Sequence, residues 1–509
     1  MKKFVRSIIL ASFIISLNGC AINDFFATLE KEYTGENEYS FEDGRYINKK
    51  HADTGKSIET LYNAFNAKTN DKNESLYDSY DENLLYSNID YNSEKVKDIN
   101  LTRTVQELEE NKYSTPTKGD VRGLVVPIDF VDSPASFANN AYMPSYHSVT
   151  SYYYNSSYGK LNMSFDVVDW FRMRKNSSYY EKLSDDDYYG KVPGVSAIVL
   201  EVLSSLSKYI DLSLYDNDKD GEIDLLYIIY NHKVTGNFWW AFHYGVFERK
   251  KFDGVYPCKY VFAGYSFLNE NNEHCNTKTY IHESGHNFGL IDYYDDDMTL
   301  GSSKGGLGGA DMMDCNYGDH NAYSKMVLGW IDKVFLINLD NEESYRFKLP
   351  NFSNTGAIFM FTNNNTFNKD DDIFQEYFLL EYYDCSSLLN KGELFTTNGL
   401  ILYHINGQTE TVTENNLTYK TLKYNNSTTN INLIDKINHG YQTSIFPFVS
   451  HELSYLYSKS SSKHLVADDY GLYQKGNSSG DLSSFGLSNY SFYVEDINGQ
   501  YASIIITHK

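Results

Sequence analysis

The segment HESGHNFGLIDYYD, residues 282–295, constrains the fold of this 509-residue chain more than any other. His282 and His286 are four positions apart, so on a helix both imidazoles project from the same face. Gly289 follows closely, and a residue that tolerates positive φ can end a helix abruptly and turn the chain back. The segment therefore predicts a helix over residues 278–289 whose two histidines can share one cation.

The turn beyond this helix supplies a third ligand. Asp292, six residues after His286, is the first oxygen ligand past the turn, and Asp295 is the alternative. Two imidazoles and one carboxylate can hold Zn²⁺ with a fourth position open to water, whose pKa falls toward about 7. Glu283, beside the first histidine, can take the proton of that water. The pattern predicts a catalytic zinc site, and the alternative is an ordinary helix with two hydrogen-bonded core histidines.

A second acidic motif, LYDNDKDGEID at residues 214–224, has alternating carboxylates around a glycine turn. Such loops can enclose a hard cation with oxygen ligands, as in EF-hands, where the residue after the glycine contributes its backbone carbonyl. Tyr227 occupies the twelfth position, so the bidentate glutamate of a full EF-hand is missing. The motif predicts a structural Ca²⁺, with a solvated acidic turn as the alternative. The predicted ligands are Asp216, Asp218, Asp220, Glu222 and Asp224.

The charge of the chain restricts its partners. A formal net charge of -24 argues against nucleic acid, because phosphate binding requires basic patches. Hydrophobic residues at 41% and aromatic residues at 16% indicate a folded chain, long enough for two or three domains. We expect a monomer that does not bind DNA or RNA.

The N-terminus, MKKFVRSIILASFIISLNGC, has a basic head and an apolar stretch at residues 8–17. That stretch is too short for a permanent membrane helix, so it predicts a secretory signal. The small residue before Cys20 makes it resemble a bacterial lipoprotein signal, in which Cys20 is acylated; a plain signal is the alternative. We expect an extracytoplasmic protein, either a cell-surface lipoprotein that contacts the membrane through a lipid anchor only, or a secreted one.

Four cysteines remain after Cys20. An even number in an exported chain permits disulfides, and a Cys258–Cys275 bridge is possible, with four free thiols as the alternative. The pairing cannot be derived from spacing. The remaining cysteines are Cys258, Cys275, Cys315 and Cys385.

The polarity and the pattern of apolar residues change twice along the chain. Residues 20–116 are polar and predict a pro-segment or spacer. Strand-like runs at 123–130, 161–167 and 225–230, with apolar residues at helical spacing over 195–210, predict an α/β or α+β layer ahead of the zinc motif. Strand-like runs at 357–362, 377–383, 400–405 and 501–507 predict an all-β, sandwich-like C-terminal domain.

Beyond the zinc motif, GGLGGADMMDCNYGDHNAYSKMVLGW at residues 305–330 contains a methionine pair and a helix-like segment. HExxHxxGxxD, this methionine turn and AYSKMVLGW together resemble the immune inhibitor A family of secreted bacterial zinc metallopeptidases, relatives of the metzincins. SYGKLNMSFDVVDW, EYFLLEYYD and GLILYHIN extend the resemblance over roughly residues 118–410. Cys315 departs from the family pattern, where a small polar residue is expected, and the loop after Asp292 is unusually acidic.

The resemblance implies a zincin-like catalytic domain and an exported zinc endopeptidase acting on protein or peptide substrates. It places Met313 in the turn beneath the zinc, with Met312 as the competing candidate. Tyr317 could donate a hydrogen bond to a developing oxyanion, whereas His243 and His320 are interpreted as structural. The predicted domains are a signal peptide at 1–19, the pro-segment or spacer at 20–116, a catalytic domain at 117–335 and a β-rich domain at 336–509.

Two other functions remain open from the sequence. A surface adhesin or ligand-binding lipoprotein could keep both ions only as structural staples and catalyse nothing. A zinc hydrolase of glycan-linked substrates is a weaker alternative, since no carbohydrate signature is present. Glu283 argues against the adhesin, because a purely structural site has no use for an acid–base residue beside an open coordination position.

Overall fold

The computed structural model is a mixed α/β structure with many strands and few helices. It describes residues 37–51, 55–67, 95–112, 114–135, 139–185, 192–246, 250–270, 273–294, 307, 311–362, 367–393, 395–414, 417–427, 429, 431–437, 472–479 and 489–509. The predicted signal peptide, Cys20 and Asp295 lie outside these residues. Within the described ranges, no helix combines the length and apolar character needed to cross a membrane.

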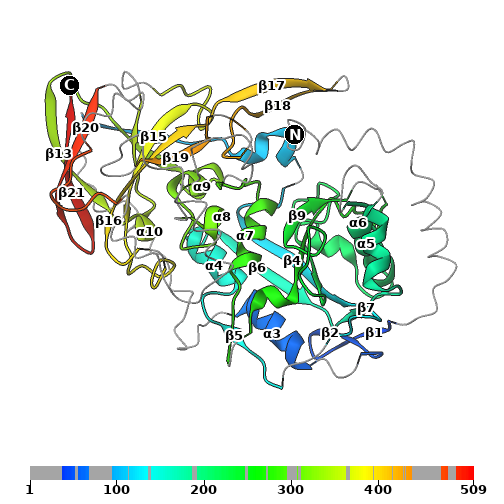
Figure 1. Ribbon diagram of the computed structural model, residues 1–509. Helices are drawn as coiled ribbons and strands as arrows, with labels where there is room; N and C mark the ends of the chain where they lie inside the picture. Colours follow the sequence, from blue (N-terminus) through cyan, green and yellow to red (C-terminus); the bar gives the residue numbers. More distant parts are fainter. Residues whose placement is uncertain are drawn as a thin grey trace. The chain divides into compact units, whose positions relative to one another are not determined.

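The chain divides into two compact units (Figure 1). The first contains the described residues within 1–78, 110–155 and 160–289, and the second those within 79–109, 156–159 and 290–509. The first unit ends at Gly289, shortly after the helix that carries His282 and His286, and Leu290 returns the chain to the second unit.

The first unit is built on a six-stranded sheet with the order β6-β4-β8-β10-β9 and with β7 beside β4. β4 runs parallel to β6, β7 and β8, and β8 runs parallel to β10, whereas the edge strand β9 is antiparallel to β10. The strands are β4 (Gly119–Asp129), β6 (Leu161–Val167), β7 (Phe171–Arg172), β8 (Leu226–Tyr230), β9 (Phe242–Gly245) and β10 (Lys259–Gly264). The strands predicted at 123–130, 161–167 and 225–230 are confirmed.

Helices and two small strand pairs complete this unit. The helices are α3 (Gly55–Asn66), α4 (Val149–Ser156), α5 (Ser177–Asp185), α6 (Val192–Leu206) and α7 (Lys278–Asn287), with 3₁₀ turns η2 (Glu109–Asn111), η3 (Leu212–Tyr215) and η4 (Tyr265–Leu268). The strand pairs are β1 (Tyr39–Glu42) with β2 (Arg45–Asn48), and β5 (Met143–Pro144) with β11 (His274–Cys275).

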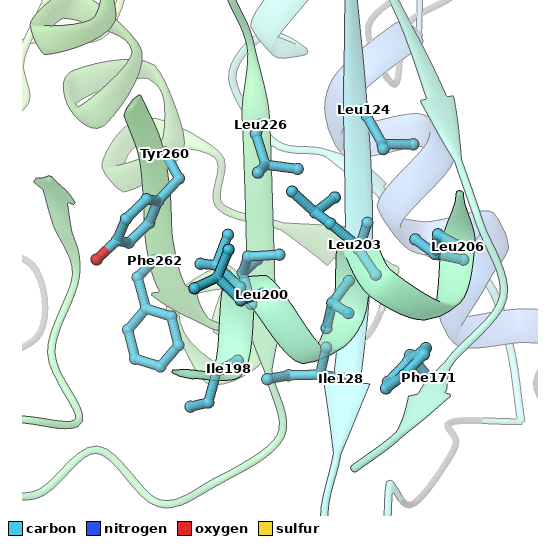
Figure 2. Close-up of a cluster of buried hydrophobic side chains, with 14 of the residues drawn as sticks. Leu124, Ile128, Phe171, Ile198, Leu200, Leu203, Leu206, Leu226, Tyr260 and Phe262 are labelled. Carbon is cyan, nitrogen blue, oxygen red and sulfur yellow. The ribbon is translucent and has the colours of Figure 1, made fainter. Parts of the chain in front are cut away.

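One face of the sheet is covered by α6, as Figure 2 shows. Alternate residues of a strand point to opposite faces, so Leu226 and Ile228 of β8 meet the helix while Tyr227 points away. Leu203 and Leu206 of α6 are fully buried against these strands. The helical run predicted at 195–210 is confirmed up to residue 206, and its apolar face is core.

The other face of the sheet carries α3 and α7. Phe65 of α3 is fully buried and packs edge-on against Phe165 and Tyr227 of the sheet, at ring-centroid distances of 5.0 and 4.9 Å. It also stacks on Tyr280 of α7 at 5.4 Å. Residues 55–66, inside the predicted pro-segment or spacer, are therefore part of the core of the first unit.

The second unit contains two sheets that share one apolar core. Phe335, Phe359 and Leu380 of the larger sheet pack in the same cluster as Phe347 and Ile504 of the smaller one. The larger sheet has the order β19-β16-β15-β14-β12-β3, the smaller β13-β21-β20, and β17 pairs with β18 as a separate hairpin. The strands predicted at 357–362, 377–383, 400–405 and 501–507 are confirmed as β14, β15, β16 and β21.

The elements of the second unit have these bounds. The strands are β3 (Val96–Asn100), β12 (Lys333–Ile337), β13 (Glu343–Pro350), β14 (Phe359–Phe361), β15 (Glu376–Tyr383), β16 (Gly399–Asn406), β17 (Thr409–Glu414), β18 (Leu417–Leu422), β19 (Ile434–Ile437), β20 (Tyr490–Ile497) and β21 (Tyr501–His508). The helices are α8 (Met312–Cys315), α9 (Ala322–Val327) and α10 (Phe352–Thr355), with the 3₁₀ turn η1 (Val105–Glu107). β3 precedes the main sheet of the first unit in the sequence, yet it pairs with β12. Residue 335, the predicted end of the catalytic domain, lies inside β12.

A buried ion pair stabilises the segment AYSKMVLGW. The Lys325 ammonium is fully buried and lies 2.6 Å from Asp319. The same ammonium lies over the ring of Tyr158 at 4.4 Å, and Asp319 also accepts a hydrogen bond from Ser156 at 2.6 Å. A buried charge is costly unless it is paired, so each partner requires the other.

The four described cysteines, Cys258, Cys275, Cys315 and Cys385, are free thiols. The possible Cys258–Cys275 disulfide is not formed. The alternative of four free thiols is confirmed.

The packing of α3 predicts a large effect of Phe65→Ala on stability. The variant should lower the free energy of unfolding by about 3–5 kcal/mol, because it removes a fully buried ring and leaves a cavity. Phe41→Ala is the matched control, since Phe41 lies in the same N-terminal segment and is 65% exposed. Urea unfolding measures both variants, and equal midpoints would show that α3 is not part of the core.

Candidate metal centre

Most of the helix α7 is buried, and its two histidines lie on a different side from the residues that face the sheet. Tyr280, Ser284 and Asn287 follow helical spacing on one side, and His282 and His286 project from another. The two imidazoles lie with ring centroids 5.1 Å apart and planes at 82°. The predicted helix is confirmed, and its two histidines are neighbours.

Hydrogen bonds fix α7 on the sheet of the first unit. The Tyr227 hydroxyl of β8 lies 2.6 Å from the Ser284 hydroxyl, and the Tyr280 hydroxyl donates to the Gly264 carbonyl at 3.0 Å. From α4, the Tyr153 hydroxyl donates to the Ile281 carbonyl at 2.7 Å. These bonds satisfy buried polar atoms and set the rotation of the helix about its axis.

The turn after α7 depends on Gly289. This residue has φ of 98°, which L side chains rarely adopt, and its N–H donates to the His286 carbonyl at 3.0 Å. A Cβ at position 289 would lie 2.9 Å from Cγ of Asn111. The Asn111 amide donates to the Gly289 carbonyl at 3.3 Å, and the Thr115 N–H donates to the Asn287 carbonyl at 2.9 Å. Asn111 and Thr115 thus cap the end of α7.

The turn brings Asp292 to the two histidines. His282, His286 and Asp292 each offer a ligand atom, and these atoms all lie within 4.8 Å of one another. His282 is buried, whereas the other two are partly exposed. Two imidazole nitrogens and one carboxylate oxygen are a donor set that fits Zn²⁺ with a position left for water. The alternative third ligand, Asp295, lies outside the described residues.

Glu283 follows the first histidine in the same helix and is 6% exposed. The next residue, Ser284, is held by Tyr227, so the helix cannot rotate without breaking that bond. A carboxylate one residue from a ligand lies about 100° around the helix from it. Glu283 is therefore placed next to the ligand face, on a helix whose orientation is fixed.

The methionine segment connects to the third ligand within the second unit. Met312 and Met313 are both fully buried in α8, and the Asp311 carboxylate caps this turn by accepting from the Met313 N–H at 2.7 Å. The Met313 carbonyl accepts from the N–H of Tyr293 at 2.9 Å. Because Tyr293 directly follows Asp292, this bond connects the methionine turn to the segment that carries the predicted third ligand.

Tyr317 lies just beyond that turn. It lines a cavity of the second unit, together with Asp319, Glu381 and Tyr403. Burial raises the pKa of Glu381 to about 8. The oxyanion role of Tyr317 stays a prediction. His320, also interpreted as structural, is 1% exposed and lies beside Trp330 with ring centroids 5.9 Å apart.

His243 lies beside His286 of the candidate metal centre, although the two residues are distant in the sequence. It lies on the edge strand β9, and its ring is stacked on that of His286 at 6.0 Å and 28°. Burial, Lys259 and His286 hold the pKa of His243 well below its ordinary value. No local motif in the sequence connects residue 243 with the helix at 278–287.

The acidic loop brings three of its four predicted side-chain ligands together. Carboxylate oxygens of Asp216, Asp218 and Asp224 lie within 4.8 Å of one another, a group that does not include Asp220. The Asp220 carboxylate instead accepts from the Glu222 N–H at 2.8 Å. The backbone carbonyl of Glu222 stays a predicted ligand.

The geometry of this loop fits a cation. Gly221 has φ of 94°, and its N–H donates to one oxygen of Asp216 at 3.1 Å. The other oxygen of Asp216 is buried and has no hydrogen-bond partner among the described residues. Burial and the nearby charges of Asp218 and Asp220 raise the pKa of Asp224 to about 7. An oxygen-rich, crowded group of carboxylates of this kind is stabilised by a hard cation.

Comparison with models of known protein families gives no match to this chain, and comparison with curated proteins gives no significant match. The function is therefore inferred from the residues and geometry of the site.

The turn at Gly289 predicts a specific effect of Gly289→Ala. The variant should lose about 1 kcal/mol or more of stability from backbone strain, and also affinity for Zn²⁺, because the new Cβ displaces Asn111 and the chain leading to Asp292. Gly254→Ala is the matched control: Gly254 has φ of 91°, and a Cβ at this position would have no neighbouring atom within 4 Å. Chelator competition measures the affinity, and an equal Zn²⁺ affinity in both variants would contradict the role of the turn.

Proposed function

We propose that the protein is an exported zinc endopeptidase, anchored by lipid at Cys20, that hydrolyses peptide bonds in proteins or peptides. The observation that carries this proposal is the convergence of Asp292 with His282 and His286 of one fixed helix, which also carries Glu283. Two histidines and a carboxylate also suit Fe²⁺. Glu283 favours hydrolysis, because an acid–base group beside an open coordination position is what a metal-activated water requires.

The residues of the chain have distinct roles in this reaction. When bound, Zn²⁺ supplies charge that polarises the peptide carbonyl and makes water acidic enough to attack at neutral pH. Glu283 accepts the proton of the attacking water and then donates it to the leaving amine. Tyr317 is a candidate donor to the developing oxyanion.

The fold supports a zincin-type catalytic domain for the first unit. Its sheet is parallel except for the edge strand β9, and α7 packs on the face opposite α6. Met313 is the proposed floor of the zinc site, which is supported by its burial and by the bond from Tyr293 to its carbonyl. Asp292, Met313 and Tyr317 extend this proposed catalytic domain into the second unit, and residues 336–509 of that unit are the proposed β-rich accessory part.

The catalytic role predicts that Glu283→Gln abolishes turnover without removing the metal. Cleavage of a denatured protein substrate should fall by about 10²–10⁴-fold, because the amide cannot accept a proton. Zinc content should stay at the wild-type level, whereas Asp292→Ala should lower it. Glu273→Gln, an exposed glutamate shortly before α7, is the matched control and should cleave like the wild type.

Each outcome separates the candidate functions. Cleavage that a chelator abolishes and that Glu283→Gln lacks supports the peptidase. Equal cleavage by the wild type and Glu283→Gln excludes the role of Glu283. Stoichiometric zinc without cleavage of any protein substrate by the wild type supports the adhesin or ligand-binding lipoprotein instead.

We further propose that the loop at residues 216–224 binds a structural Ca²⁺. The support is the group of Asp216, Asp218 and Asp224 oxygens, with one Asp216 oxygen buried and lacking a hydrogen-bond partner among the described residues. The loop precedes β8, whose Tyr227 bonds to Ser284 of α7. A cation here would fix the start of a strand that supports the metal-motif helix.

The calcium proposal predicts a Ca²⁺-dependent melting temperature. At 100 times the dissociation constant, Ca²⁺ should stabilise the wild type by about 2.7 kcal/mol. Asp218→Asn should lose most of this shift, because Asp218 belongs to the group of three. Asp220→Asn, an equally exposed residue outside that group, is the matched control and should keep the shift. Equal shifts in the two variants, measured by calorimetry, would exclude this ligand set.

A further inference from the structure

His243 has a fixed position beside the metal ligands. It belongs to β9, where it is paired with Val261 of β10 in an antiparallel ladder. Its ring lies nearly parallel to that of His286, with centroids 6.0 Å apart and an angle of 28°. His282 approaches the same ring edge-on, at 5.1 Å and 82°. His286 therefore has one flat and one edge-on aromatic neighbour.

The plane of His286 matters because an imidazole binds a metal through a lone pair that lies in the ring plane. The helix fixes the Cα of His286 but leaves the terminal torsion of the side chain broad. Rotation about that torsion would move the nitrogen away from the point shared with His282 and Asp292. Groups around metal ligands commonly set this orientation and thereby the affinity for the metal.

His243 can restrict this rotation because its backbone is held in the sheet and its ring is buried. The ladder between β9 and β10 fixes the backbone, and Nε2 of His243 has no access to solvent. His243 is not one of the three residues whose ligand atoms lie within 4.8 Å of one another. Its contact with the site is thus through the ring of His286.

We propose that His243 is a positioning residue of the metal centre, which holds the ring plane of His286 by stacking and so increases the affinity for Zn²⁺. This inference rests on the proposed zinc site. It assigns to the edge strand β9 a part in building the metal centre, in addition to completing the sheet.

The test compares three variants of the full chain. His243→Ala removes the ring, His243→Phe keeps a flat ring without nitrogen atoms, and His232→Ala is the matched control. His232 is stacked on Trp239 at 4.2 Å and the same 28° angle, and Trp239 belongs to the core cluster that includes α6. Zn²⁺ affinity is measured by chelator competition, the ligand geometry by the visible absorption of the Co²⁺-loaded protein, and stability by the melting temperature of the metal-free form.

His243→Ala should weaken Zn²⁺ binding by about 10–100-fold and alter the Co²⁺ spectrum, while its metal-free melting temperature stays close to that of His232→Ala. His243→Phe should restore most of the affinity and the wild-type spectrum. Wild-type affinity and spectrum in His243→Ala would overturn the inference while leaving the zinc site in place. A His243→Phe variant as weak as His243→Ala would overturn stacking as the cause. Failure of the wild type to bind Zn²⁺ would overturn the proposed function as well.

Discussion

The metal centre depends on the abrupt end of α7 at Gly289. A helix that continued past this point would carry Asp292 away from the two histidines. The positive φ of Gly289 turns the chain, and Asn111 and Thr115 donate to carbonyl groups that the helix end would otherwise leave unpaired. The proposed third ligand, Asp292, therefore follows a turn that is bonded to a segment more than 170 positions earlier in the chain.

A helix with so many polar residues needs specific partners. The buried hydroxyls of Ser284 and Tyr280 bond to the sheet or to its strand ends, and each unpaired buried group would cost about 1–3 kcal/mol. The same bonds prevent a rotation of the helix that would turn both His282 and His286 away from Asp292. Stability and the geometry of the site thus have a common origin in the contacts between α7 and β8.

Local pattern was sufficient to predict much of this structure. Apolar runs and alternation predicted the strands, and spacing of 3.6 residues predicted the buried face of α6. The order His282, His286, Gly289, Asp292 predicted a group of ligand atoms that converge across a helix end. Contacts between distant segments carry no such signal. The packing of Phe65, the pairing of β3 with β12 and the stacking of His243 all depend on the tertiary fold. In the acidic loop, spacing could not show which carboxylates converge, since this depends on the backbone turn at Gly221.

The most direct test of the metal centre is anomalous diffraction at the zinc edge from crystals of the Zn²⁺-loaded protein. The expected result is one strong peak bonded to imidazole nitrogens of His282 and His286 and to a carboxylate oxygen of Asp292, at about 2.0–2.2 Å. A peak elsewhere, or a peak with only one of these side chains as ligand, would contradict the central claim that the turn at Gly289 assembles a three-ligand zinc site.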